Sequence, residues 1–219
     1  MTSTSRLKSF LIISPILVLI ITRIGIEFSV RYFRHEIAWI PSFIAYYFAI
    51  TLMFFIASKY FSLPFRQNLS FSIKPLPKFG LLFWAIIIPA LLPLAVFIPN
   101  IKFVPVDFIF YIIIFSFINP IFEEGFWRGL LYFIPINNKL RILYTAGLFS
   151  FSHFFFWGYW FNDLLVLIPT LISTFIMGVL WMWFMQKQKN LIYPIISHFF
   201  VDFFNLSVAV YFGLVPKHF

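Results

Sequence analysis

Cysteine is absent from the 219 residues, and charged residues make up only 11% of them. The lack of cysteine excludes disulfide frameworks, thiolate catalysis and cysteine-ligated metal sites, so any chemistry must use oxygen and imidazole groups. Acidic residues are the scarcer charged class, with 7 Asp and Glu against 16 Lys and Arg. A net charge of +9 can indicate nucleic-acid binding, but these basic residues are scattered over short segments between apolar runs. We therefore expect no nucleic-acid partner and attribute the basic excess to membrane topology.

Apolar and aromatic residues dominate what is present. Hydrophobic residues account for 62% of the chain and aromatic residues for 24%, which is far outside the range of soluble domains. The composition predicts an all-α polytopic membrane protein, a bundle of about seven (six to eight) transmembrane helices in a lipid bilayer. We expect residues 1–219 to form a single transmembrane domain. The tryptophans, among them Trp157, Trp160, Trp181 and Trp183, are interpreted as lipid-facing or interfacial anchors without a chemical role.

The spans can be placed from the apolar runs. The predicted spans are residues 7–26, 37–61, 79–98, 106–134, 141–161, 164–185 and 191–214. The first run is too long for a cleaved signal peptide and no cleavage site of small residues follows it, so we interpret it as a helix. Pro89 and Pro93 lie inside the third span, and we expect them to break it into pieces.

Lysine and arginine are unevenly distributed over the predicted loops. The second, fourth and sixth loops are basic and carry Lys59, Arg66, Lys74, Lys78, Lys139, Arg141, Lys187 and Lys189. Because cytoplasmic loops are enriched in Lys and Arg, we expect the even-numbered loops and the N-terminus to be cytoplasmic. The membrane would be the inner (plasma) membrane of a bacterium or archaeon. The first loop departs from the rule with Arg23, Arg31 and Arg34, and we interpret that segment as interfacial.

Ionisable residues are rare inside membrane spans and usually mark functional sites. The fourth span contains "FEEGFWRGLL", in which Glu124 and Arg128 are four residues apart in the favourable order for an ion pair on one helix face. Glu123 lies about 100° around the helix from Glu124 and can therefore face a different partner. Asn119 precedes Glu123 by one turn and could hydrogen-bond to it.

Two later spans contribute histidine. His153 lies in the apolar run "FSFSHFFFW", and "SHFFVDFFN" places His198, Asp202 and Asn205 along one stripe of a helix. Glu123, His153 and His198 are about 11, 12 and 7 residues from the predicted cytoplasmic ends of their spans, which is roughly 10 to 18 Å deep. We therefore expect these three helices to bring polar groups to one layer of the membrane.

Each of these residues also has a purely structural interpretation. Glu124 and Arg128 could form a buried ion pair that fixes helix register, and a lone buried histidine is more often bonded to a carbonyl than catalytic. Asp202 could form a salt bridge or clamp the His198 ring, and Asn205 could hydrogen-bond between helices. Two histidines at matching depth beside a spare glutamate favour a functional site instead.

The chemistry of these groups leaves two mechanisms open. A glutamate and a histidine that converge can hold and deprotonate water, while His198 with Asp202 could stabilise the oxyanion of a tetrahedral intermediate. In that case the aspartate would fix the histidine tautomer. Alternatively, Glu123, His153 and His198 could ligate zinc and leave a coordination site for water. The His-Glu-x-x-His helix of the best-known zinc proteases is absent.

Three short motifs resemble those of a known family. "EEGFWR" matches Glu-Glu-x-x-x-Arg, "FSFSH" matches Phe-x-x-x-His, and "HFFVD" matches His-x-x-x-Asn/Asp, in that order and on separate helices. Together they resemble the CPBP family, also called Abi or CAAX-protease-like intramembrane proteases, which is related to the type II prenyl-protein endopeptidases. The resemblance covers about residues 119–205, within a protease-like core of about 106–214.

The resemblance implies an intramembrane endopeptidase that cleaves a membrane-associated protein or peptide. It assigns water activation to Glu123 and His153, and oxyanion stabilisation to His198 and Asp202. The family has been described both as metalloproteases and as metal-independent glutamic proteases. We expect no cofactor, because the Glu-His and His-Asp pairs use all four groups, with zinc on Glu123, His153 and His198 as the alternative.

Supporting roles fall to the neighbours of these residues. By the resemblance Glu124 and Arg128 support the site, and we add Asn119 and Asn205 because they share helix faces with it. One departure concerns Asp202, because the third motif of the family often ends in asparagine. An ionised aspartate cannot donate a hydrogen bond, so its place in the oxyanion site would depend on His198.

Two other classes of function are consistent with these residues. A non-catalytic membrane adaptor or bacteriocin-immunity-type protein could have kept the site without using it. Carboxylates and histidines also form the proton relays of transporters. However, the polar groups here cluster at one depth and no repeat relates the two halves of the chain, which favours the protease over a transporter.

Overall fold

The computed structural model describes residues 3–61, 63, 71–73, 77–160 and 164–206. The regular elements within these residues are helices, which confirms the predicted all-α fold. Their bounds are α1 Ser3–Tyr32, α2 His35–Phe61, α4 Phe79–Leu82, the π-helical segment η1 Phe83–Ile87, α5 Ile88–Leu91, α6 Leu94–Asn100, the 3-10 turn η2 Ile101–Phe103, α7 Val106–Glu124, the π-helical segment η3 Gly125–Leu130, the 3-10 turn η4 Leu131–Phe133, α8 Asn138–Trp160, α9 Leu164–Gln188 and α10 Ile192–Phe204.

Among the residues that the structure describes, five helical segments are long and apolar enough to cross a membrane. They are Ser5–Tyr32, Ile37–Phe61, Phe79–Phe103, Val106–Phe133 and Leu167–Gln188. The described part of α10 is apolar but shorter, and residues 207–214 of the last predicted span lie outside the described residues. α8 has the length of a span, but polar residues such as Thr145, Ser152 and His153 lower its hydropathy. Each predicted span therefore corresponds to one helical segment of the bundle.

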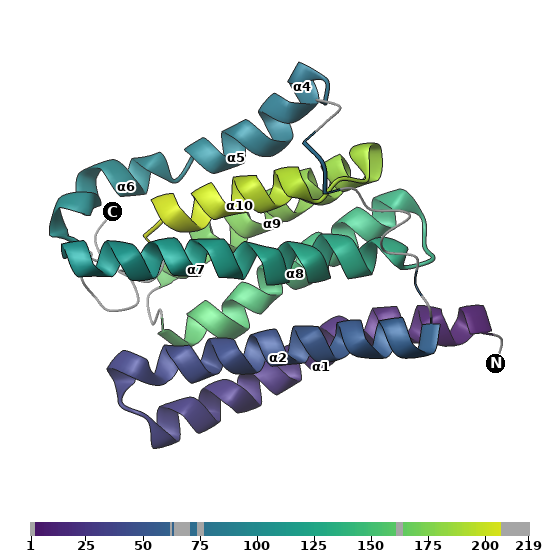
Figure 1. The fold of residues 1–219 in the computed structure, drawn as a ribbon, viewed down its shortest axis with the longest axis horizontal. Coiled ribbons are helices and arrows are strands. Elements are labelled where there is room, and N and C mark those ends of the chain that lie inside the picture. The colour runs from purple at the N-terminus through teal and green to yellow at the C-terminus, as the bar shows by residue number, and fades with distance from the viewer. Residues whose placement is uncertain (1–2, 62, 64–70, 74–76, 161–163, 207–219) are drawn as a thin grey trace.

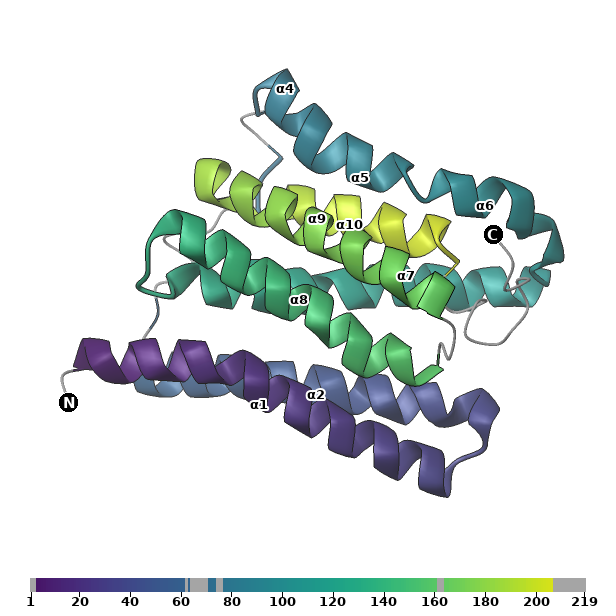
Figure 2. The same cartoon turned by 180° about the vertical axis from the view of Figure 1, so that it is seen from behind.

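Successive spans alternate in direction (Figures 1 and 2). The N-terminal end of α1, the beginning of α4, the connection from η4 to α8, and the turn between α9 and α10 all lie at one end of the bundle. The turn from α6 through η2 to α7 lies at the other end. The described ends of the basic loops predicted to be cytoplasmic therefore lie at the end that also holds the N-terminus, and Arg66 and Lys74 of the second loop lie outside the described residues.

The third span is interrupted, as its prolines predicted. The π-helical segment η1 leads into α5, which contains Pro89, and the chain turns at Leu92 and Pro93 before α6 begins. Proline has no N–H for the helix ladder, and its ring crowds the preceding turn. The Ser197 hydroxyl of α10 donates to the Ile86 carbonyl in η1 at 2.8 Å. The irregular segment is thus hydrogen-bonded to the helix that carries His198.

Arg23 and Arg31, which the sequence assigned to the first loop, lie in α1, and the interfacial position of this segment stays a prediction. α1 continues to Tyr32, so both side chains belong to the helix, and Arg23 pairs with Glu27 one turn further on. Hydropathy predicted a helix that is too short. Charged residues at the end of the run lower its hydropathy, but they do not interrupt the backbone hydrogen bonds of the helix. This ion pair is exposed.

Candidate active site

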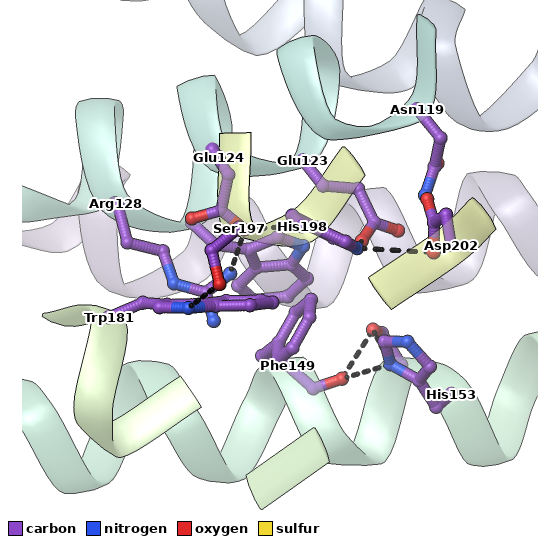
Figure 3. Close-up of polar contacts among 12 residues, drawn as sticks. Asn119, Glu123, Glu124, Arg128, Phe149, His153, Trp181, Ser197, His198 and Asp202 are labelled. Atoms are coloured by element: carbon purple, nitrogen blue, oxygen red, sulfur yellow. Dashed lines mark hydrogen bonds and ion pairs between the residues drawn. The ribbon is translucent and has the colours of Figure 1, made fainter. Parts of the chain in front are cut away.

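A buried polar cluster lies where α7, α8, α9 and α10 meet (Figure 3). Exposed fractions are 0% for Glu124, 3% for His198, 5% for Glu123 and 6% for Asp202. His153 on α8 is only partly buried. Charges are costly to bury unless they are paired and hydrogen-bonded, so the partners of each group define what the cluster can do.

Glu124 and Arg128 form the ion pair that their spacing predicted. Arg128 Nη1 donates to Glu124 Oε1 at 2.9 Å, and both side chains are buried. α7 ends at Glu124 and continues into η3, which contains Arg128. Such π-helical turns occur frequently at functional sites, and here one lies directly after the two glutamates.

Glu124 has a second partner that the spacing did not predict. Its Oε1 also lies 2.8 Å from His198 Nδ1, so the same oxygen bridges Arg128 and His198. A carboxylate can only accept, so Nδ1 carries the hydrogen and the ring orientation is fixed. The sequence suggested Asp202 for this clamping role, whereas the short hydrogen bond comes from Glu124.

The other nitrogen of His198 faces two carboxylates. Nε2 lies 3.6 Å from Glu123 Oε2 and 3.5 Å from Asp202 Oδ1. Both ring nitrogens therefore face carboxylate oxygens, and a ring protonated on both nitrogens donates on both sides. Among the residues that the structure describes, Glu123 Oε2 has no hydrogen-bond partner. Glu123 thus presents a buried oxygen that is not committed to a protein donor.

Asn119 contacts Asp202 and not Glu123, its predicted partner. Its Nδ2 donates to Asp202 Oδ2 at 2.9 Å, and its Oδ1 accepts from the Tyr47 hydroxyl at 3.2 Å. Asn205 directly follows α10, one turn beyond Asp202, and its backbone amide bonds to the Val201 carbonyl.

His153 is oriented by its own helix. Its Nδ1 lies 2.8 Å from the Phe149 carbonyl, and a carbonyl only accepts, so Nδ1 carries the hydrogen and Nε2 has the lone pair. The Ser152 hydroxyl lies 3.5 Å from the same nitrogen. Figure 3 shows the ring across the cluster from Glu123, on the side of Asp202. This tautomer is the one that can accept a proton from a water molecule.

Aromatic rings enclose the charged groups. Trp181 is fully buried and its ring stacks on His198 with centroids 4.8 Å apart. The Arg128 guanidinium lies 4.0 Å from the centroid of Phe149 and 5.0 Å from that of Trp181. The interpretation of Trp181 as a lipid-facing anchor is therefore wrong, because a guanidinium and an imidazole cover its faces.

Trp181 also makes a polar contact within the site. Its Nε1 donates to Ser197 Oγ at 3.2 Å. Trp183 is partly buried, and the side chains of Trp157 and Trp160 lie outside the described residues.

Two tyrosines of α2 are further site residues that sequence reasoning missed. Tyr46 and Tyr47 are adjacent in the middle of the second span. Tyr47 bonds to Asn119, and the Tyr46 hydroxyl accepts from Trp127 Nε1 at 3.0 Å. A buried tyrosine hydroxyl normally has a hydrogen-bond partner, so this pair at mid-span was itself a signal of a polar neighbour.

The arrangement does not provide a preformed zinc site. Among the described residues no group of three or more His, Asp or Glu side chains is placed to hold a metal ion. His198 and His153 each use Nδ1 for a protein acceptor, and only their Nε2 atoms remain as ligands. Zinc requires several such atoms at about 2 Å from one point, which Glu123, His153 and His198 do not provide as they stand.

The fold and the cluster define an integral membrane protein with an intramembrane ionisable site. Residues 105–204, just under half of the chain, match the family model Rce1-like, described as type II CAAX prenyl endopeptidase Rce1-like. The match confirms the CAAX-protease-like resemblance over these residues. It covers α7 to α10, and the earlier helices lie outside it. No curated protein and no solved structure matched the chain.

Proposed function

We propose that this protein is an intramembrane endopeptidase that hydrolyses a peptide bond of a membrane-associated protein or peptide. The observation that carries the proposal is the placement of His198 between two glutamates. Glu124 lies 2.8 Å from Nδ1 and Glu123 lies 3.6 Å from Nε2. A structural ion pair requires only Glu124 and Arg128, whereas Glu123 has an oxygen without a hydrogen-bond partner among the described residues.

Glu123 and His153 activate water in this proposal. Glu123 takes a proton from the water as its oxygen attacks the carbonyl carbon of the scissile bond. His153 Nε2, which has the lone pair, accepts a hydrogen bond from the same water and orients it. The proton on Glu123 then passes to the leaving amine, so that the carboxylate is regenerated.

His198 stabilises the oxyanion. Glu124 holds the ring through Nδ1, so that an N–H at Nε2 can donate to the charged oxygen of the tetrahedral intermediate. Asp202 cannot donate when ionised. Its role is to accept from Asn119 at 2.9 Å and to offset the charge of His198 from 3.5 Å. This differs from a family member with asparagine at that position, in which the side chain itself can donate.

The substrate in this proposal is itself associated with the membrane. Peptide pheromone precursors, C-terminal sorting tails and prenylated proteins all fit a site reached from the bilayer. The description of the matching family makes a peptide ending in a prenylated cysteine motif the first probe. We further propose cleavage near the cytoplasmic face of a bacterial or archaeal inner membrane, in a single transmembrane domain.

The test compares Glu123→Gln and His153→Ala with the wild type. Purified protein in lipid nanodiscs would be given an internally quenched prenylated peptide and its unprenylated counterpart. We expect kcat to fall by about 10²-fold or more in each variant, since positioned acid–base groups contribute about 10²–10⁴-fold. Glu27→Gln on the exposed part of α1 is the matched control and should retain wild-type activity. Substantial cleavage by both site variants would contradict the proposed roles of Glu123 and His153.

A chelator distinguishes the metal-independent glutamic mechanism from the zinc-dependent one. We expect a strong chelator to leave kcat unchanged. Lasting loss of activity that added zinc restores would replace the glutamic mechanism with a zinc-dependent one. In cells, a phenotype that survives Glu123→Gln would favour the non-catalytic adaptor instead.

A further inference from the structure

Tyr47, in the middle of α2, is hydrogen-bonded to the helix that carries the two glutamates. Its hydroxyl donates to Asn119 Oδ1 of α7 at 3.2 Å. α2 lies outside residues 105–204, to which the family match is confined. A side chain from outside the matched region therefore reaches a residue that contacts the buried polar cluster.

This hydrogen bond is the first of a directed chain that ends on Asp202. Asn119 Nδ2 donates to Asp202 Oδ2 at 2.9 Å, and an ionised carboxylate only accepts. The contact with Asp202 fixes which end of the Asn119 amide is nitrogen. The amide oxygen then faces Tyr47, so the tyrosine hydroxyl must donate to it. The order of donation is Tyr47 to Asn119 to Asp202.

The chain leaves the other oxygen of Asp202 for His198. Oδ2 accepts from Asn119, while Oδ1 lies 3.5 Å from His198 Nε2. The two oxygens belong to one rigid carboxylate, so a bond that holds Oδ2 also determines where Oδ1 lies. Asn119 and Asp202 are both buried, and a buried polar group that loses its partner is costly to leave unpaired. Tyr47 is thus connected to the Nε2 side of the histidine ring.

Aromatic packing fixes the ring of Tyr47. It stacks on Phe122 of α7 with centroids 4.5 Å apart and an angle of 19° between the ring planes. On its own helix it lies 5.8 Å from the ring of Phe43, one turn earlier. Contacts of this kind add to the stability gained from burial alone. They hold the Tyr47 hydroxyl against α7, at the turn that leads into Glu123.

We propose that Tyr47 is a positioning residue of the active site. Its hydroxyl holds the Asn119 amide, and this amide holds the Asp202 carboxylate in place beside His198 Nε2. In the proposed hydrolysis that nitrogen donates to the oxyanion, so the chain from α2 orients the group that stabilises the charge. The inference rests on the proposed function. It makes α2 one wall of the site and not only a membrane anchor.

The kinetic test is Tyr47→Phe, which keeps the ring and removes only the hydroxyl. We expect kcat for the quenched prenylated peptide to fall about three- to tenfold while KM stays within about twofold, because one neutral hydrogen bond away from the bound peptide is lost. The matched control is Tyr144→Phe, which removes another partly buried hydroxyl that bonds between helices, to the Ile12 carbonyl at 2.5 Å. That variant should keep the wild-type kcat. A kcat in Tyr47→Phe lowered no more than in Tyr144→Phe would overturn the inference.

The route through Asn119 has a test of its own. Asn119→Ala removes the link between Tyr47 and Asp202. We expect Tyr47→Phe, added to Asn119→Ala, to leave kcat within about twofold of Asn119→Ala alone, because the hydroxyl then has no amide to hold. The same fold-loss from Tyr47→Phe in both backgrounds would mean that the hydroxyl acts by another route, contrary to the inference.

A measurement without substrate distinguishes failure of this inference from failure of the proposed function, and it replaces the double variant if Asn119→Ala cleaves too slowly to measure. Nitrogen NMR of protein labelled at its 4 histidines reports on the ring nitrogens, and His198→Gln identifies the signals of His198. We expect Tyr47→Phe to shift the His198 Nε2 resonance and Tyr144→Phe to leave it unchanged. An unmoved resonance in Tyr47→Phe would overturn the inference. A shifted resonance in a protein that cleaves no probe would overturn only the proposed peptidase.

Discussion

One oxygen of Glu124 accepts hydrogen bonds from two side chains. Oε1 accepts from Arg128 Nη1 and from His198 Nδ1 at 2.9 and 2.8 Å. Within the described residues, Glu124 Oε2 and Arg128 Nη2 have no hydrogen-bond partner, although both atoms are buried. The cluster therefore depends on Coulomb attraction and on the faces of Phe149 and Trp181 over the guanidinium. Removing the charge of Glu124 would leave two buried donors facing a neutral group.

We expect Glu124→Gln to lower the free energy of unfolding by about 3–5 kcal/mol, the usual effect of breaking a buried ion pair. The variant should also lose peptidase activity because Nδ1 of His198 loses its anionic partner. Thermal unfolding in detergent measures the first effect. Glu27→Gln is the matched control, since it removes an i,i+4 partner of an arginine that is 40% exposed, and such pairs contribute under about 1 kcal/mol. Equal melting temperatures for the two variants would contradict this account.

Spacing predicted the contacts within one helix and not those between helices. The Glu124–Arg128 pair follows from a separation of four residues, whereas Glu124 and His198 are 74 positions apart in the chain. The second contact depends on how α7 and α10 are rotated about their axes, which no local pattern specifies. For the same reason Asn119 was assigned to Glu123, its neighbour on the same helix face, although its bond runs to Asp202 on α10.

At the scale of the elements, the crossing of α8 and α9 positions the two aromatic faces of the site. Gly178 on α9 lies against Ala146 on α8, and an added Cβ would be 3.0 Å from Ala146 Cα and 3.4 Å from the Phe149 ring. A side chain at this position would therefore push apart the helices that carry Phe149 and Trp181. Small residues allow this kind of close approach between membrane helices.

We expect Gly178→Ala to destabilise the protein by about 1–3 kcal/mol through overpacking. It should also lower kcat, because His153 moves with α8. Gly147→Ala is the control on α8, where nothing lies within 4 Å of an added Cβ. That change should be neutral or stabilise the helix by up to about 1 kcal/mol. Melting temperature and cleavage rate are measured for both, and a Gly178→Ala protein as stable and active as Gly147→Ala would contradict the close packing.

Hydropathy predicted where the spans lie better than where their helices end. The prolines correctly located the break after η1, because the loss of a backbone N–H is a local effect. The extension of α1 to Tyr32 and the π-helical segment η3 were not predicted. An amphipathic helix end carries few apolar residues, and a π-helical turn is set by the packing around it, so neither has a strong signal in a hydropathy profile.

For the whole molecule, the alternating spans give the two ends of the bundle different charges. The end that holds the N-terminus also holds the segments with Lys139 and Lys187, and the η2 turn with Lys102 lies at the opposite end (Figure 1). This arrangement has the alternation that the positive-inside rule requires, except that the end of α1 with Arg31 lies at the same end of the bundle as the η2 turn. Which end faces the cytoplasm also fixes the side from which a substrate reaches the site, so the orientation has a direct functional consequence.

The absence of cysteine makes the orientation testable with single replacements. Lys102→Cys and Lys187→Cys are a matched pair, since both lysines are exposed and lie at opposite ends of the bundle. In sealed spheroplasts we expect a membrane-impermeant maleimide to label Lys102→Cys at once and Lys187→Cys only after the membrane is permeabilised, because the end with more basic loops remains cytoplasmic. The unmodified protein, which has no thiol, should stay unlabelled throughout. Labelling of Lys187→Cys alone in sealed spheroplasts would reverse the topology and move the proposed cleavage to the outer face.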